Sequence, residues 1–341
     1  MAYPYPSTRA LAIPPKPSLA PRYLGPVLSM VATTALWAIA FIVPLELPEA
    51  SASDISFGRF FAYGACSLFL LGRSGVSKFT ARDWALALWF GIFGNILYYF
   101  VLVLGIQISG PGLAVPIVGL LPVTVSLFGN MRAGDLPMRA LIVPLFAVLI
   151  GLLLVNFSRG GTFEGAATAS PAGLLCLILP VIMWTWYAVA NAAFLKRRSD
   201  VQAAEWASVV GAATLGVAML WFAATVVFGA GGSAFPRLLG SGRWAGFAFW
   251  SLVLGLGSSW GAAALFNKAS ACLPVSLTGQ LIVFETVFGV AYVFVAEGRL
   301  PKLIEIFGFA LAITGIWLSI RVVQRLGRST TSGVTPPRIA K

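Results

Sequence analysis

Residues 171–194 read PAGLLCLILPVIMWTWYAVANAAF and contain no charged side chain, whereas the next residues, 195–198, read LKRR. A helix that spans a bilayer needs about 20 predominantly apolar residues, and a transmembrane barrel strand needs about 10. The stretch is long enough for a helix, is continuously apolar rather than alternating, and ends in a group of cations. It predicts a transmembrane helix with its basic end at a membrane surface.

Further apolar segments of similar length occur on both sides of this one, and short connections between them carry most of the charge. The ten predicted spans are 24–45, 54–72, 84–107, 109–130, 138–158, 171–194, 203–229, 244–267, 271–296 and 303–322. Their composition does not show the alternation typical of barrel strands. The sequence therefore predicts an all-α integral membrane protein with ten transmembrane helices.

The composition agrees with this class and excludes others. Of the 341 residues, 59% are hydrophobic and 10% are charged, whereas a soluble domain carries roughly 25% charged residues. The long apolar stretches also exclude a disordered chain. Because there is no histidine and the three cysteines lack metal-ligand spacing, we expect no metal and no cofactor, and we exclude nucleophile pairs that need histidine.

The basic residues fall mainly on one side of the predicted membrane. Seventeen of the 23 Lys and Arg share the side of the N-terminus, five lie on the other side, and Arg59 lies within the second span. Because positive charge marks cytoplasmic loops, both termini are predicted to be cytoplasmic. The anionic leaflet then explains the net charge of +12, which does not indicate nucleic-acid binding. We expect a disordered Pro-rich tail at 1–23 and a basic tail at 323–341.

Short motifs recur at one fixed offset of 164 residues. The recurring pairs are Gly134 and Gly298, Gly151 and Gly315, and the Leu-Pro dipeptides at 136–137 and 300–301. Two halves, 24–158 and 171–322, each contain five predicted spans, so the second half enters the membrane from the opposite side. The sequence therefore predicts two inverted-topology repeats, as in carriers that alternate access around a central site.

Four segments carry a family resemblance: ALWAIAFIVPLEL at 35–47, LLPVTVSLF at 120–128, IVFETVFGVAYVFVAEGRLP at 282–301 and FGFALAITGIWL at 307–318. They resemble motifs of the drug/metabolite transporter superfamily, in the EamA-type group with two five-helix domains. Thr286 and Ala296 stand where that group often has Pro and Gly. The resemblance covers 24–322 and implies a secondary carrier of the bacterial inner membrane, commonly an exporter of amino acids, other small metabolites or drugs.

Two ionisable residues inside the predicted spans are candidates for function. Glu285 lies at mid-membrane depth in the ninth span, where a charged group costs on the order of 2.5–3.5 kcal/mol by insertion scales. It is either a coupling or substrate residue that binds and releases a proton, or a protonated carboxyl group hydrogen-bonded within the bundle. Arg59 either extends outward to the membrane surface or contacts a substrate carboxylate.

Aromatic and amide side chains inside the spans are candidates for the wall of a solute cavity. The candidates are Trp37, Asn95, Tyr99, Trp184, Tyr187, Asn191 and Gln280. Those on the third and sixth spans recur at spacings of three, four or seven residues, which puts them on one helix face. Such a wall suits an amphipathic or aromatic small molecule. The alternatives are core packing or lipid contact for the rings, and interhelical hydrogen bonding for the amides.

A carrier that exports a small organic solute by alternating access, with or without proton coupling, accounts best for these features. The expected partners are the bilayer and the solute, and the sequence is compatible with a homodimer. A membrane-embedded enzyme is the first alternative, although Glu285 has no second carboxylate at its depth. A non-transporting membrane assembly protein is the second, and it has no need of a duplicated five-helix unit.

Overall fold

All the regular secondary structure described for this chain is helical. The computed structural model describes residues 21–74, 78–109, 117–134, 136–158, 170–228, 242–298 and 300–331. Those residues form helices and their connections and include no strand. The predicted all-α class is confirmed. The greater part of each predicted tail lies outside the described residues.

The helices of the first half of the chain are α1 (Pro21–Ala38), the 3-10 turn η1 (Ile39–Phe41), α2 (Val43–Glu46), α3 (Ala52–Ser74), α4 (Ala81–Phe90), η2 (Gly91–Ile96), α5 (Leu97–Ser109), α7 (Leu121–Ala133) and α8 (Met138–Ser158). Those of the second half are α10 (Pro171–Arg197), α11 (Ala203–Phe228), α13 (Trp244–Leu252), η3 (Val253–Gly261), α14 (Ala262–Cys272), α15 (Val275–Leu281), α16 (Val283–Glu297) and α17 (Leu303–Thr331). The segments η2 and η3 are π-helical.

Seven helical segments of the described residues are long and apolar enough to cross a membrane. They are Ser53–Arg73, Ala81–Leu102, Met138–Val155, Pro171–Arg197, Ala203–Ala224, Trp244–Cys272 and Leu303–Arg325. Two shorter apolar helices also match predicted spans. Tyr23–Ala38 overlaps the first span, and Val275–Gly289 lies within the ninth. The chain is thus a multi-pass helical membrane protein, whereas the count of ten spans and the inverted repeats stay predictions.

Two helices continue beyond the predicted ends of their spans. α14 reaches Cys272 and α17 reaches Thr331, whereas the apolar pattern ends at about 267 and 322. A helix does not end where apolarity ends, since polar residues also adopt helical backbone. α14 stops shortly before Pro274, because a proline disfavours helical backbone at the residue before it.

Local signals set several helix ends. The side chains and backbone amides of Thr80 and Asp83 form a reciprocal capping box at the start of α4. The Ser170 hydroxyl accepts a hydrogen bond from the Gly173 amide at the start of α10. Gly134 ends α7 with φ of 66°, a left-handed conformation that favours glycine.

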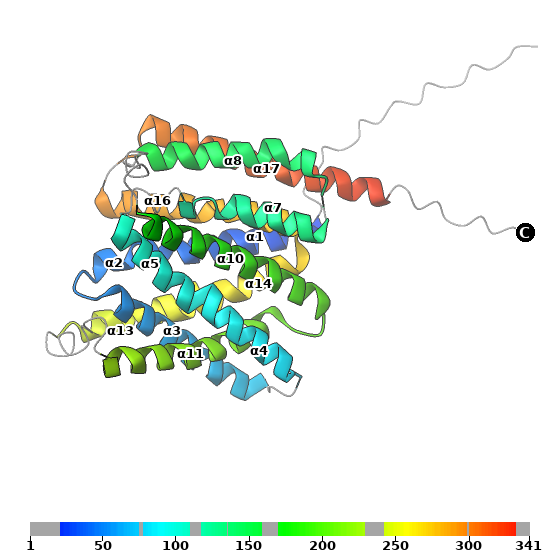
Figure 1. Cartoon of the computed structure of the whole chain (residues 1–341). Helices are drawn as coiled ribbons and strands as arrows, with labels where there is room; N and C mark the ends of the chain where they lie inside the picture. The colour runs from blue at the N-terminus through cyan, green and yellow to red at the C-terminus, as the bar shows by residue number, and fades with distance from the viewer. Residues whose placement is uncertain are drawn as a thin grey trace, which may run out of the picture.

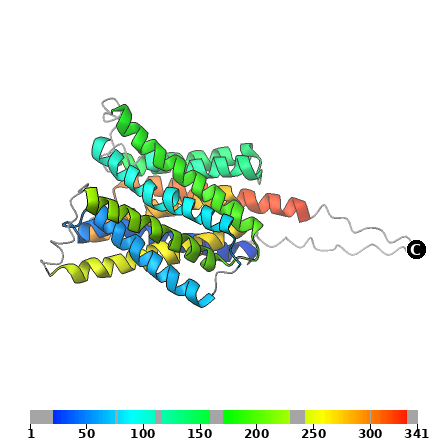
Figure 2. The same cartoon turned by 60° about the horizontal axis from the view of Figure 1, so that its bottom comes forward.

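The long helices lie side by side in one bundle (Figure 1). α8 and α17 form a pair at one edge of that view, and α3, α4 and α11 lie toward the opposite edge. The turned view shows α10 alongside α5 (Figure 2). α8 and α17 approach closely where two glycines meet: a Cβ atom added to Gly151 would lie only 2.5 Å from the carbonyl oxygen of Gly308. Small residues at a helix contact permit such an approach.

The outer surface of the bundle is apolar. Leu220 on α11 and Phe307 on α17 expose 74% and 69% of their surface, and many other large apolar side chains are exposed on the same helices and their neighbours. Contiguous apolar surface of this kind marks a membrane contact. The perimeter of the bundle therefore faces lipid.

Ionic contacts join two connections at one end of the molecule, called here the basic end because it carries Lys78, Arg132, Lys196 and Arg198. Arg198 donates to Asp83 at 2.7 Å and to Asp200 at 2.9 Å, and Lys78 pairs with Glu205. Hydrogen bonds from the Arg198 guanidinium lower the pKa of Asp200. The α3–α4 and α10–α11 connections are thus tied together at this end.

Candidate functional site

Two π-helical segments, η2 and η3, interrupt long helices inside the bundle. Single π-helical turns within α-helices occur frequently at functional sites. A Cβ atom added to Gly255 of η3 would lie 2.8 Å from the Arg59 carbonyl oxygen and 2.4 Å from the Ala62 Cβ atom. Because glycine has no side chain, the α3 backbone packs directly on η3, and this contact brings Arg59 to the π-helical segment.

Arg59 is half-buried and held within the bundle. Its Nε atom donates to the Ser259 hydroxyl at 2.8 Å, and a terminal nitrogen donates to the Ser258 carbonyl oxygen at 3.4 Å. Arg59 and Tyr99 also line one small cavity of ≈ 40 Å³. The guanidinium is therefore anchored on η3 beside a tyrosine from α5.

Glu285 lies just after a one-residue turn, Ile282, that separates two helices. α15 ends at Leu281, and α16 begins at Val283 with Glu285 in its first turn. Glu285 interacts electrostatically with Arg59 and with Tyr98, and its side chain is only half-buried. Arg59 on α3 and Glu285 on α16 are thus within range of an electrostatic interaction.

Four rings form a group called here the aromatic cluster: Trp37, Trp184, Tyr187 and Phe266. The Trp37 ring centroid lies 5.5 Å from that of Trp184 and 5.4 Å from that of Phe266, and the Trp184 centroid lies 5.9 Å from that of Tyr187. The rings come from α1, α10 and α14. Three of them are sequence candidates, and the structure brings them into contact.

Ser258 connects the aromatic cluster to Arg59. Its carbonyl oxygen accepts from the Arg59 guanidinium, and its hydroxyl donates to the carbonyl oxygen of Leu36, the residue before Trp37. Arg59 and the α1 backbone beside Trp37 are therefore joined through one residue of η3, and Arg59, Glu285 and the aromatic cluster are together called here the central region. This region is the candidate site.

Asn191 belongs to a buried hydrogen-bond network. Its amide nitrogen donates to the Asn267 side-chain oxygen at 2.8 Å, and its amide oxygen accepts from the Trp206 indole at 2.8 Å. Asn267 in turn donates to the Ala203 carbonyl oxygen at 3.1 Å. The network joins α10, α11 and α14, so interhelical bonding occupies the Asn191 amide on both sides.

The other two amide candidates also lie at helix contacts. Asn95 of η2 donates to the Thr214 hydroxyl of α11 at 3.1 Å. Gln280 is fully buried and accepts from the Ser319 hydroxyl of α17, while its amide nitrogen has no partner among the described atoms.

Sequence reasoning did not single out several residues of the central region. Tyr98 interacts with both Arg59 and Glu285, Phe266 completes the aromatic cluster, and Ser258 and Ser259 hold the guanidinium. The two serines carried a usable signal, because adjacent hydroxyls in an apolar helix need partners. Phe266 carried none, since a phenylalanine in a membrane helix is ordinary.

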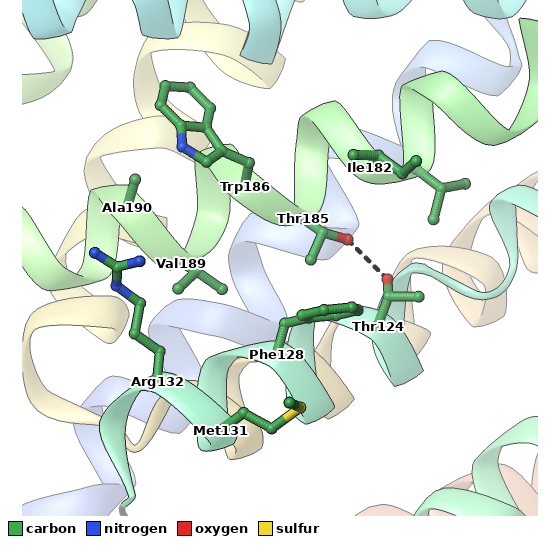
Figure 3. Close-up of a pocket in the computed structure, with 10 residues that line it drawn as sticks. Thr124, Phe128, Met131, Arg132, Ile182, Thr185, Trp186, Val189 and Ala190 are labelled. Atoms are coloured by element: carbon green, nitrogen blue, oxygen red, sulfur yellow. Dashed lines mark hydrogen bonds between the residues drawn. The ribbon is translucent and has the colours of Figure 1, made fainter.

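A larger cavity of ≈ 440 Å³ lies apart from the sequence candidates, between α7 and α10 (Figure 3). Thr124 and Thr185, one from each helix, bond through their hydroxyl groups at 2.8 Å within it. The described residues that line it include no acidic residue and none of the sequence candidates.

Comparisons with known proteins define the class. Residues 24–157 match the model of the EamA-like transporter family, so the helical membrane bundle is that of a membrane transporter. Over 310 residues the chain is 32% identical to inner membrane protein YtfF of Escherichia coli K12. The aligned region covers 84% of this chain and 92% of YtfF. The chain belongs to the EamA-like transporter family, and its resemblance to the drug/metabolite transporter superfamily and its inner-membrane location are confirmed.

The fold is also found in a solved structure. A protein of known crystal structure superposes on this chain with a TM-score of 0.69 at 19% identity, covering 88% of this chain and 98% of the other. At that identity the likeness establishes the fold.

Proposed function

We propose that this chain is a secondary transporter that exports a small organic solute by alternating access. Ten transmembrane helices form two inverted five-helix halves, 24–158 and 171–322. The solute binds in the central region, between Arg59, Glu285 and the aromatic cluster. Glu285 carries a proton in exchange for the solute.

The observation that carries the proposal is the recurrence of helix irregularities at the sequence offset of 164 residues. Gly91 begins η2, and Gly255, 164 residues later, lies in η3. α7 begins at Leu121 directly after a turn, and α16 begins at Val283 after another; these starts correspond to within two residues. Two halves with the same irregularities at the same positions are expected of a structural repeat.

Helix pairing supports the same relation. α1 packs against α14, and α10 packs against α5: in each pair, the first helix of one half contacts the third helix of the other. At the edge of the bundle, a Cβ atom on Gly151 would meet the Gly308 carbonyl oxygen at 2.5 Å. At the offset of 164 residues, Gly151 corresponds to Gly315 and Gly308 corresponds to Pro144. A Cβ atom on Gly315 would lie 2.7 Å from the Pro144 carbonyl oxygen, so the two contacts are equivalent.

The chemistry of the central region supports the kind of solute. An arginine and a carboxylate provide opposite charges for an ionised small molecule, and the aromatic cluster provides an apolar wall beside them. Glu285 interacts electrostatically with Arg59, so protonation of its carboxyl group changes the charge that a solute meets.

Proton coupling is tested on Glu285. The purified protein is reconstituted in vesicles, and a panel of labelled amino acids and aromatic drugs is screened for flux above that of protein-free vesicles. We expect a pH gradient to accelerate flux through the wild type, and Glu285→Gln to remove this acceleration because an amide does not take up a proton near neutral pH. The matched control is Glu49→Gln, since Glu49 pairs with Arg243 outside the central region.

The outcomes separate the parts of the proposal. Unchanged acceleration in Glu285→Gln contradicts the coupling role and leaves transport standing. A membrane-embedded enzyme would convert a panel compound rather than move it, and an assembly protein would do neither, so product analysis of the vesicle contents distinguishes both alternatives.

A further inference from the structure

The groove between α7 and α10 is separate from the central region. It has a volume of ≈ 440 Å³ and is lined by Thr124, Phe128, Met131, Arg132, Val181, Ile182, Thr185, Trp186, Val189 and Ala190. Figure 3 shows α7 along one side and α10 along the other, with the two threonines joined across the groove. Such a volume accommodates a small organic group or part of a lipid.

The walls of the groove are apolar and open to the perimeter of the bundle. Phe128, Met131 and Ile182 expose 57%, 68% and 57% of their surface, so the groove is reached from the lipid side. Its floor includes the buried Val181 and Val189. Because the Thr124 and Thr185 hydroxyls bond to each other, they offer few free polar contacts to a solute. The groove therefore suits a hydrocarbon chain.

One cation stands at the end of this apolar groove. Arg132 is exposed and lies in the last turn of α7, and its guanidinium extends to the α10 side near Ala190 (Figure 3). Lys196 and Arg197 end α10 at the same basic end of the bundle. A basic pocket between transmembrane helices near a membrane surface is a typical place for an acidic lipid headgroup.

We propose that this groove binds one anionic phospholipid of the leaflet at the basic end. An acyl chain lies against Phe128, Ile182 and Val189, and the phosphate contacts Arg132. A second copy of the chain fits less well, because it would cover the cation Arg132, and none of the described residues that line the groove is acidic. The inference does not depend on transport, since it concerns a different surface.

Thermal unfolding of the purified protein in detergent tests the proposal. Phosphatidylglycerol and phosphatidylcholine with the same acyl chains are titrated in parallel. We expect phosphatidylglycerol to raise Tm at lower concentration than phosphatidylcholine, and Arg132→Gln to weaken its apparent affinity about fivefold, since one basic residue near a membrane contributes about 1 kcal/mol. Arg139→Gln is the matched control, because Arg139 is exposed near the start of α8 and does not line the groove.

A steric variant tests the apolar part without altering charge. Ile182→Trp fills the groove from an exposed position, so the fold tolerates the larger ring, and we expect it to weaken the lipid effect as well. Equal shifts with both lipids, or equal losses in Arg132→Gln and Arg139→Gln, would overturn the proposal. So would inorganic phosphate acting as well as the lipid, or a cross-linked dimer that Ile182→Trp abolishes.

Discussion

Asn191 shows what an amide does inside an apolar bundle. Its sequence position is compatible with a solute contact or with interhelical bonding, because both satisfy a polar group in hydrocarbon. Its partners, Trp206 and Asn267, are 15 and 76 residues away, so the sequence pattern alone does not identify them. The structure uses both ends of the amide for helix contacts. We expect its role to be stability rather than solute binding.

Replacement of Asn191 measures that role. Asn191→Leu leaves the Trp206 indole and the Asn267 amide without their partner, and an unsatisfied buried polar group costs about 1–3 kcal/mol. We therefore expect a lower Tm in detergent and unchanged apparent affinity for the transported solute. Because Trp206 is itself fully buried, Trp206→Phe should lower Tm on its own, but by less in the Asn191→Leu background, where the indole has already lost its acceptor. A variant with wild-type Tm and weakened solute affinity would instead indicate a site residue.

The charged candidates were more informative than the amides. Few charges occur within the predicted spans, so Arg59 and Glu285 stand out from the sequence, and the structure connects them electrostatically. The position of Arg59 against η3 could not be predicted, because it depends on the contact of Gly255 with the α3 backbone. Tyr98 and Phe266 belong to the central region because of how the helices pack, and the sequence pattern does not reveal that packing.

At the scale of the element, apolar runs predict helix location well and helix irregularity poorly. The predicted span 138–158 coincides with α8, whereas α14 and α17 continue past the ends of their apolar runs. The π-helical segments and the break before α16 were not predicted. Glycines permit such departures without dictating them, and the packing of neighbouring helices selects them.

The contact between α8 and α17 gives a test of the glycine packing. Gly151→Ala would put a Cβ atom 2.5 Å from the Gly308 carbonyl oxygen, so the helices must separate, at a cost of about 1–3 kcal/mol for overpacking. We expect a lower Tm. Gly72→Ala in α3 is the control, because that Cβ atom meets nothing within 4 Å, and helix propensity favours alanine by about 1 kcal/mol. Equal effects of the two substitutions would contradict the close contact.

For the whole molecule, composition and charge predicted the membrane class, which the apolar perimeter and the family match confirm. The proposed inverted relation of the two halves rests on a sequence offset of 164 residues, which also relates η2 to η3 and the two glycine contacts of α8 with α17. A repeat of this kind matters for function because exchanging the conformations of its halves turns one access state into the other. Solute identity depends on finer geometry of the central region, which residue type alone does not determine.

Solute counterflow in vesicles tests alternating access most directly. Vesicles containing the purified protein are loaded with an unlabelled compound that the flux screen identifies, and labelled compound is added outside at low concentration. A carrier with one site exposed alternately to each side predicts a transient accumulation of label inside above its outside concentration, larger in loaded than in unloaded vesicles. Two results would contradict alternating access. One is uptake that only approaches the outside concentration and is the same in loaded and unloaded vesicles. The other is flux equal to that of protein-free vesicles for every compound in the panel.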